Sequence, residues 1–188
     1  MQYDIPILFI VYKRINVSLK VFNEIKKIKP KQLFICSDGF KSNADMKMVL
    51  SLRKTLLNNI NWDCELKLLF REKNLGCGLN VSSSISWFFE HVEHGIILED
   101  DCLPSESFFH FSKQMLTLYR DNDNISHISG SNLNVNYHFK HDYLFSNYPL
   151  VWGWATWRSS WKHFEYDMGS FDERSLKKLC LKNFLNYK

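Results

Sequence analysis

The stretch IILEDD, residues 96–101, decides how this chain folds. Its apolar half predicts a buried strand, and its acidic half predicts that the strand ends at a polar edge of a sheet. Three adjacent carboxylates raise one another's pKa and resist ionisation unless a positive group shares their site. We expect that group to be a divalent cation, and hard carboxylate oxygens suit Mg²⁺ or Mn²⁺. The alternative is a solvated turn whose acids favour the start of the next helix.

On both sides of this stretch, apolar runs of strand length alternate with apolar residues at helical spacing. The sequence predicts five strands, bounded by Pro, Gly or Asn residues, at 5–12, 33–37, 65–70, 95–99 and 125–130. Helices are expected between them: the first follows Asn16 as its N-cap, the second runs from about Ser42 to Asn58, Asn80 can cap the third, and Pro104 and Ser105 open the fourth. The order βαβαβαβαβ is typical of an α/β domain whose mostly parallel sheet is flanked by helices.

Composition narrows the class of protein without naming an activity. A length of 188 residues suits one domain. The net charge of +4 is small, and the lysines are spread as on the solvated face of a helix, so no nucleic-acid partner is expected. Five cysteines without a CxxC pair favour a reducing cytosol over a disulfide framework. The longest apolar run, 5–12, is too short to span a bilayer, so we expect no integral membrane segment and no targeting segment.

Polar residues follow four of the predicted strands. In an open α/β sheet ligands bind outside the carboxyl ends of the strands, so Arg14, Asp38, the segment 71–76 and the acids 99–101 are expected at one edge. There Asp38 could accept an imide N–H of a pyrimidine, while Arg14 could bind its carbonyl group or a phosphate. The alternative is a surface ion pair between them. Neither G-x-x-x-x-G-K nor G-x-G-x-x-G occurs, so P-loop and dinucleotide readings lose their main support.

Several motifs together resemble the glycosyltransferases of the GT-A fold, closest to the family of N-acetylglucosaminyltransferase I and its bacterial relatives. The matching segments are PILFIVYKR (6–14), SDG (37–39), EDD (99–101) followed by SFF (107–109), ISGSN (128–132) and WGW (152–154). The resemblance implies a Rossmann-like GT-A sheet with a C-terminal acceptor-side cap. Residues 1–132 would form the nucleotide-sugar-binding half, and 133–188 an acceptor-side segment of the same domain that looks cut short.

The resemblance also assigns roles on the donor side. Asp101 would bind Mn²⁺ or Mg²⁺, Asp100 would contact the ribose or donor sugar, and Glu99 would support the donor. Arg14 and Asp38 would hold the base, which is uracil in the family.

Two further features concern the same donor. Asn74 and Gly76 resemble an N-x-G turn near the donor diphosphate. The chain departs from the family in the helix after this turn, where Ser83 or Ser84 stands in place of a histidine beside the uracil.

On the acceptor side the resemblance points to Trp152, Gly153 and Trp154, with Trp152 and Trp154 expected in a loop. The family's catalytic base follows an aromatic residue after this segment, so Asp172 is a candidate, the alternative being a base beyond residue 188. Trp157 is expected in a helix, as a core residue.

The expected activity is metal-dependent, inverting transfer of a sugar from a UDP-sugar to a saccharide acceptor such as a surface-polysaccharide precursor, in the cytosol or at the inner membrane surface. Two alternatives stay open: a non-catalytic nucleotide-sugar-binding module, and a metal-dependent phosphohydrolase.

Overall fold

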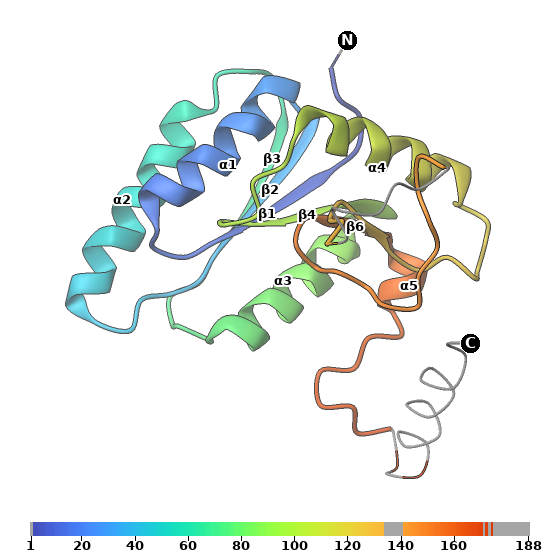
Figure 1. The fold of residues 1–188 in the computed structure, drawn as a ribbon. Coiled ribbons are helices and arrows are strands. Elements are labelled where there is room, and N and C mark those ends of the chain that lie inside the picture. Colours follow the sequence, from blue (N-terminus) through green and yellow to red (C-terminus); the bar gives the residue numbers. More distant parts are fainter. Residues whose placement is uncertain (1, 134–140, 171, 173, 175–188) are drawn as a thin grey trace.

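In the computed structural model, which describes residues 2–133, 141–170, 172 and 174, one twisted sheet forms the centre of the chain (Figure 1). The described strands are ordered β3-β2-β1-β4-β6-β5. Strands β1 to β4 run parallel, and β6 runs antiparallel to both β4 and β5. The strands are β1 (Ile7–Val11), β2 (Gln32–Ser37), β3 (Glu65–Phe70), β4 (His94–Glu99), β5 (Ile128–Ser129) and β6 (Trp154–Trp157).

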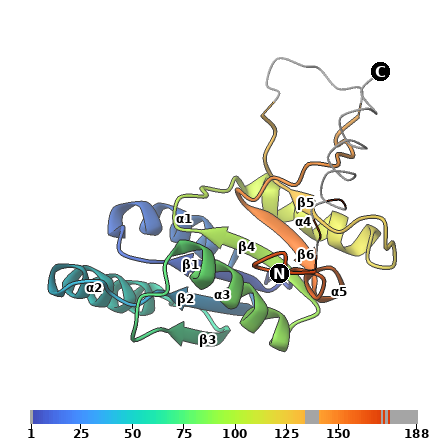
Figure 2. The same cartoon turned by 90° about the horizontal axis from the view of Figure 1, so that it is seen from below.

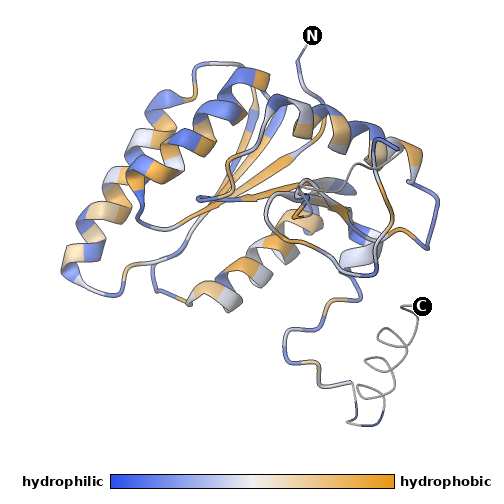
Figure 3. Ribbon diagram, in the orientation of Figure 1, coloured by the Kyte–Doolittle hydropathy of each residue, from blue (hydrophilic) through white to orange (hydrophobic). Residues whose placement is uncertain are grey.

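Helices cover both faces of this sheet (Figures 1 and 2). They are α1 (Ile15–Ile28), α2 (Asn43–Asn59), α3 (Cys77–His91), α4 (Glu106–Leu118) and the short α5 (Arg158–Trp161). Alternate residues of β1 face opposite layers: Phe9 packs with the α1, α2 and α4 side chains, and Leu8 with those of α3. Figure 3 shows the resulting apolar strands between helices that carry both polar and apolar residues. The predicted α/β fold, with a mostly parallel, Rossmann-like sheet flanked by helices, is confirmed.

Element boundaries agree best where a cap has a strong local signal. The hydroxyls of Ser42 and Ser105 accept hydrogen bonds from backbone N–H groups at 3.2 and 3.4 Å, so α2 and α4 begin as predicted. Strand 65–70 has its predicted bounds, whereas 5–12 shortens to Ile7–Val11 and 125–130 to Ile128–Ser129.

Two predicted N-caps are wrong, because both helices begin earlier. Helix α1 has Arg14 as its N-cap, and the Arg14 carbonyl accepts from the Ser18 N–H at 2.9 Å, which leaves Asn16 inside the helix. Helix α3 has Gly76 as its N-cap, at a φ of 79° that favours glycine. Asn80 lies one turn further on, buried, where its side-chain oxygen accepts from Arg71 at 3.0 Å.

Strand β6 was not predicted. Trp154 starts this strand instead of lying in a loop, and Trp157 ends it instead of lying in a helix. The strand pairs with β4 across about 60 residues of chain, through register partners such as Ile97 and Trp154. Because 154 and 157 are an odd number of residues apart, the two rings enter the two opposite core layers, and both are buried.

Only part of the expected acceptor-side segment 133–188 lies among the described residues. Residues 134–140 and most of the chain after residue 170 lie outside them, so the predicted early end of this segment stays a prediction. Among the described residues, no helix combines the length and apolar character needed to cross a bilayer.

We predict that acid destabilises the fold partly through His127. Its ring stacks on Trp154 at 4.7 Å, its Nε2 lies 3.0 Å from the Leu150 carbonyl oxygen, and burial lowers its pKa. The unfolded state therefore binds a proton more readily, so stability falls as the pH drops from about 6.5. In urea unfolding at pH 7.5 and 5.5, His127→Gln should lose less stability on acidification than the wild type.

The exposed residue His110, on α4, gives the matched control. His110→Gln should keep the wild-type difference between the two pH values. Burial also lowers the pKa of His94, so His127→Gln should retain some pH dependence. The same loss in His127→Gln as in the wild type would contradict the assignment.

Candidate functional site

The carboxyl ends of β1 and β4 are joined by an ion pair. Arg14 follows β1 and caps α1, and Asp100 and Asp101 form the turn after β4. Arg14 binds Asp100 with both arms of its guanidinium group, with Nε 3.1 Å from Oδ2 and a second bond to Oδ1. It also donates to Oδ2 of Asp101 at 2.9 Å. Three charged groups predicted at the sheet edge are thus brought together.

Burial differs strongly among these groups. The side chain of Asp100 is only 8% exposed, whereas those of Arg14 and Asp101 are about half exposed. Hydrogen bonding to Asp100 raises the pKa of Arg14, while burial and the two neighbouring aspartates raise the pKa of Glu99. The positive partner expected for the acidic triplet is therefore supplied by the chain itself, and a divalent cation at Asp101 stays a prediction.

A second cluster surrounds Asp38, which follows β2 and is 4% exposed. Its carboxylate accepts from the backbone N–H groups of Gly39 and Leu75 at 2.9 Å, from that of Gly76 at 3.2 Å, and from the side chain of Asn74 at 2.9 Å. A carboxylate offers about four acceptor sites, so these bonds occupy it. Asp38 thereby fixes the 74–76 turn, and the expected contact of Asp38 with a base stays a prediction.

Close packing of the loops after β2 and β3 depends on Gly39. A Cβ atom at this position would lie 2.3 Å from the carbonyl carbon of Lys73. The loops also form a parallel bridge between Phe40 and Lys73. The absence of a side chain at Gly39 is therefore what lets the 74–76 turn approach Asp38.

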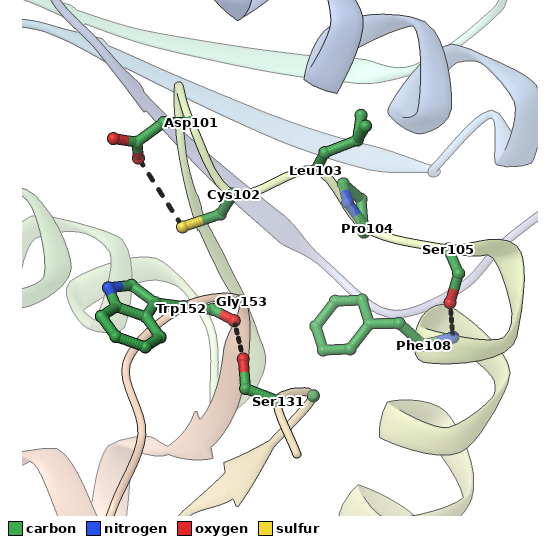
Figure 4. A pocket seen from close by; sticks show the side chains of 10 residues that line it. Asp101, Cys102, Leu103, Pro104, Ser105, Phe108, Ser131, Trp152 and Gly153 are labelled. Atoms are coloured by element: carbon green, nitrogen blue, oxygen red, sulfur yellow. Dashed lines mark hydrogen bonds between the residues drawn. The ribbon is translucent and has the colours of Figure 1, made fainter. Parts of the chain in front are cut away.

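A cavity of about 340 Å³ opens beside Asp101 (Figure 4). It is lined by Asp101, Cys102, Leu103, Pro104, Ser105, Phe108, Gly130, Ser131, Trp152 and Gly153. The hydroxyl of Ser131 donates to the Trp152 carbonyl oxygen at 2.8 Å, and Gly153 has a φ of 72°. Trp152 and Gly153 thus meet Asp101 at this cavity. Trp154 instead packs into the core against His127 and Trp161.

The structure separates the remaining expected residues from this cavity. Ser84 is buried against Cys36, and Ser83 accepts a hydrogen bond from Arg71 at 2.7 Å. Asp172 is exposed and does not line the cavity. Neighbouring Phe171 lies outside the described residues.

Sequence reasoning missed Arg53 of α2, which donates to backbone carbonyl groups at the ends of β2 and β3. A signal was present in its spacing. Arg53 comes four residues after Val49 and one after Leu52, and both of these are fully buried. A cation on the inward stripe of a helix indicates a polar partner beneath it.

The sequence matches no protein-family model and no curated protein. Solved structures that are similar in shape at low identity include the following two. HddC from Yersinia pseudotuberculosis has a TM-score of 0.42 and 8% identity, over 60% of this chain and 54% of that one, so the chain spans about half its length. The 4-diphosphocytidyl-2C-methyl-D-erythritol synthase from Anaerococcus prevotii DSM 20548 has a TM-score of 0.49 and 10% identity, over 95% and 82%. Neither likeness assigns a function to the chain.

We predict that Arg14→Met destabilises the fold by about 1–3 kcal/mol, because it leaves the nearly buried Asp100 carboxylate without its guanidinium partner. Urea unfolding at pH 7 measures the loss. Lys113→Met is the control, since it breaks an ion pair with Asp4 in which both side chains are nearly half exposed, and it should cost below about 1 kcal/mol. Equal, small losses in the two variants would contradict a structural role for the Arg14–Asp100 pair.

Proposed function

We propose that the chain is the nucleotide-sugar-binding domain of a glycosyltransferase that uses a divalent metal. It transfers a sugar from a nucleotide-diphosphate donor, most simply a UDP-sugar, to a saccharide acceptor with inversion at the transferred carbon. The proposal combines the resemblance of the motifs with the arrangement of polar groups at one edge of the sheet.

One observation carries it: the ion pair of Arg14 with Asp100 stands where the strand order reverses. The chain builds β1, β2 and β3 outward in one direction and then returns to place β4 on the other side of β1. Ligands of open α/β sheets bind in the crevice outside the carboxyl ends of the strands at such a reversal. Arg14 and Asp100 come from the two strands that border this crevice.

On the donor side, the 74–76 turn supports binding of the diphosphate. It leads directly into α3, a helix of 15 residues whose N-terminal N–H groups and dipole favour an anion. Asp38 would act here by holding the turn in place. Arg14, half exposed, would bind the base or a phosphate with the part of its guanidinium group that faces solvent.

Asp101 would hold the metal. Its carboxylate is half exposed and borders the cavity, which suits Mn²⁺ or Mg²⁺ bound through one or two carboxylates together with substrate phosphates. Among the described residues, no three His, Cys, Asp or Glu side chains group to hold a metal by themselves, so the donor would have to complete the site. When bound, the metal neutralises charge that grows on the leaving diphosphate.

On the acceptor side, the cavity beside Asp101 would hold the saccharide, with the exposed ring of Trp152 against one of its faces. Inverting transfer needs a carboxylate base within about 3 Å of the acceptor hydroxyl. Asp172 stays the candidate for this base, and its carboxylate would have to approach the cavity to reach the acceptor hydroxyl.

We predict that the protein binds UDP in the presence of Mn²⁺, and that Asp101→Asn weakens this binding at least about tenfold because it removes a charged metal ligand. Titration calorimetry measures both affinities. Asp123→Asn, a change at an exposed acid outside the cavity lining, should leave the affinity unchanged. Undiminished binding by Asp101→Asn would overturn the metal assignment, and no binding of UDP, GDP or CDP by the wild type would overturn the donor assignment.

Turnover separates the transferase from the two alternatives. The proposal expects release of UDP from a UDP-sugar with Mn²⁺ when a saccharide acceptor is supplied. Binding without any release would favour a non-catalytic module. Phosphate release from activated phosphate esters would favour a phosphohydrolase.

A further inference from the structure

We infer that Arg53, on helix α2, is a positioning residue that sets the 74–76 turn by holding the ends of β2 and β3 together. The position of the turn follows from contacts within the chain. The use of the turn to bind a nucleotide diphosphate rests on the function proposed above.

Arg53 makes four hydrogen bonds, and each goes to the same end of the sheet. Its Nη2 atom donates to the carbonyl oxygens of Ser37 at 3.2 Å, Asp38 at 3.0 Å and Arg71 at 2.8 Å. Its Nε atom donates to the hydroxyl of Ser37 at 3.0 Å. One side chain thus bonds to both strands at the point where they leave the sheet.

These contacts begin where the regular pairing of β2 with β3 ends. The last register pair is Ser37 with Phe70, and the Arg71 N–H then donates to the Ser37 carbonyl oxygen at 3.0 Å. Beyond that bond the regular ladder stops, and the two segments pair again at the bridge between Phe40 and Lys73. Arg53 supplies the donors that the strand ladder no longer provides to the carbonyl groups of Asp38 and Arg71.

Burial of the Arg53 guanidinium group carries a desolvation cost, and the hydrogen bonds of Arg53 offset it. The guanidinium group lies over the ring of Phe70 at 4.8 Å, and burial lowers the pKa of Arg53. A partly buried cation is unfavourable unless its N–H groups are bonded. Its bonds go to backbone carbonyl groups and one hydroxyl, so any movement of the strand ends would leave the cation poorly solvated.

Asp38 transmits this restraint to the turn. Arg53 fixes the Asp38 backbone through its carbonyl group, and the carboxylate of the same residue binds the N–H groups of Leu75 and Gly76. Gly76 is the N-cap of α3, so the restraint reaches the first turn of that helix. Lysine could not replace Arg53, because an ammonium group lacks the planar fork that reaches several acceptors at once.

Hydrogen exchange measured by NMR tests this inference without any ligand. In Arg53→Met and Arg53→Lys, protection of the Leu75 and Gly76 amides should fall about tenfold or more, since hydrogen bonds from a charged group are lost. Amides of β1 and β4, such as those of Ile10 and Leu98, should change much less. Lys54→Met, on the exposed side of the same helix, should leave the turn protected as in the wild type.

A binding measurement then tests the functional part. With UDP and Mn²⁺ as the probe, both Arg53 variants should bind about tenfold more weakly or worse, and Lys54→Met should bind as the wild type does. Unchanged protection at the turn, or an equal loss at every amide, would overturn the positioning role. Failure of the wild type to bind UDP would overturn the proposed function and leave the exchange result standing.

Discussion

The ion pair of Arg14 with Asp100 underlies both the edge of the sheet and the candidate site. A buried strand that ends in three carboxylates needs a positive partner, and Arg14 reaches it from the neighbouring strand. The contact joins β1 to β4 at the reversal of the strand order and holds Asp101 beside the cavity. The same contact therefore stabilises the sheet edge and defines the candidate site.

Much of the fold could be predicted because local patterns and the global arrangement agree. Apolar runs of strand length, separated by apolar residues at helical spacing, predicted the parallel core, and α2 and α4 begin near Ser42 and Ser105 as expected. Strand β6 was not predicted, because its pairing with β4 joins segments that lie far apart in the sequence. Its four residues also include two tryptophans whose side chains enter opposite core layers. Asn80 was misplaced as a cap because α3 already begins after Gly76, and the Asn80 side chain accepts a hydrogen bond from Arg71 instead.

The sequence predicted where the site lies better than it predicted which of its residues contact one another. Arg14, Asp38, Asn74 and Asp101 follow strand ends, and topology brings such residues to one edge. Sequence order does not tell which of them pair. The Asp38 carboxylate turned inward to the 74–76 turn, and the partner of the acids proved to be Arg14. Arg53 lies in a helix interior, where only its spacing from Val49 indicated an inward role.

Paramagnetic relaxation tests whether Asp101 holds the metal, because Mn²⁺ broadens the NMR signals of nearby amides. In ¹⁵N-labelled protein with UDP, trace Mn²⁺ should broaden the amides of Asp101, Cys102 and Gly153, with weaker effects at Gly76. A metal and nucleotide bound elsewhere would broaden other amides. Broadening centred on the cleft near Lys29 and Trp62, at the far end of α1, with Asp101 unaffected, would contradict metal binding at Asp101.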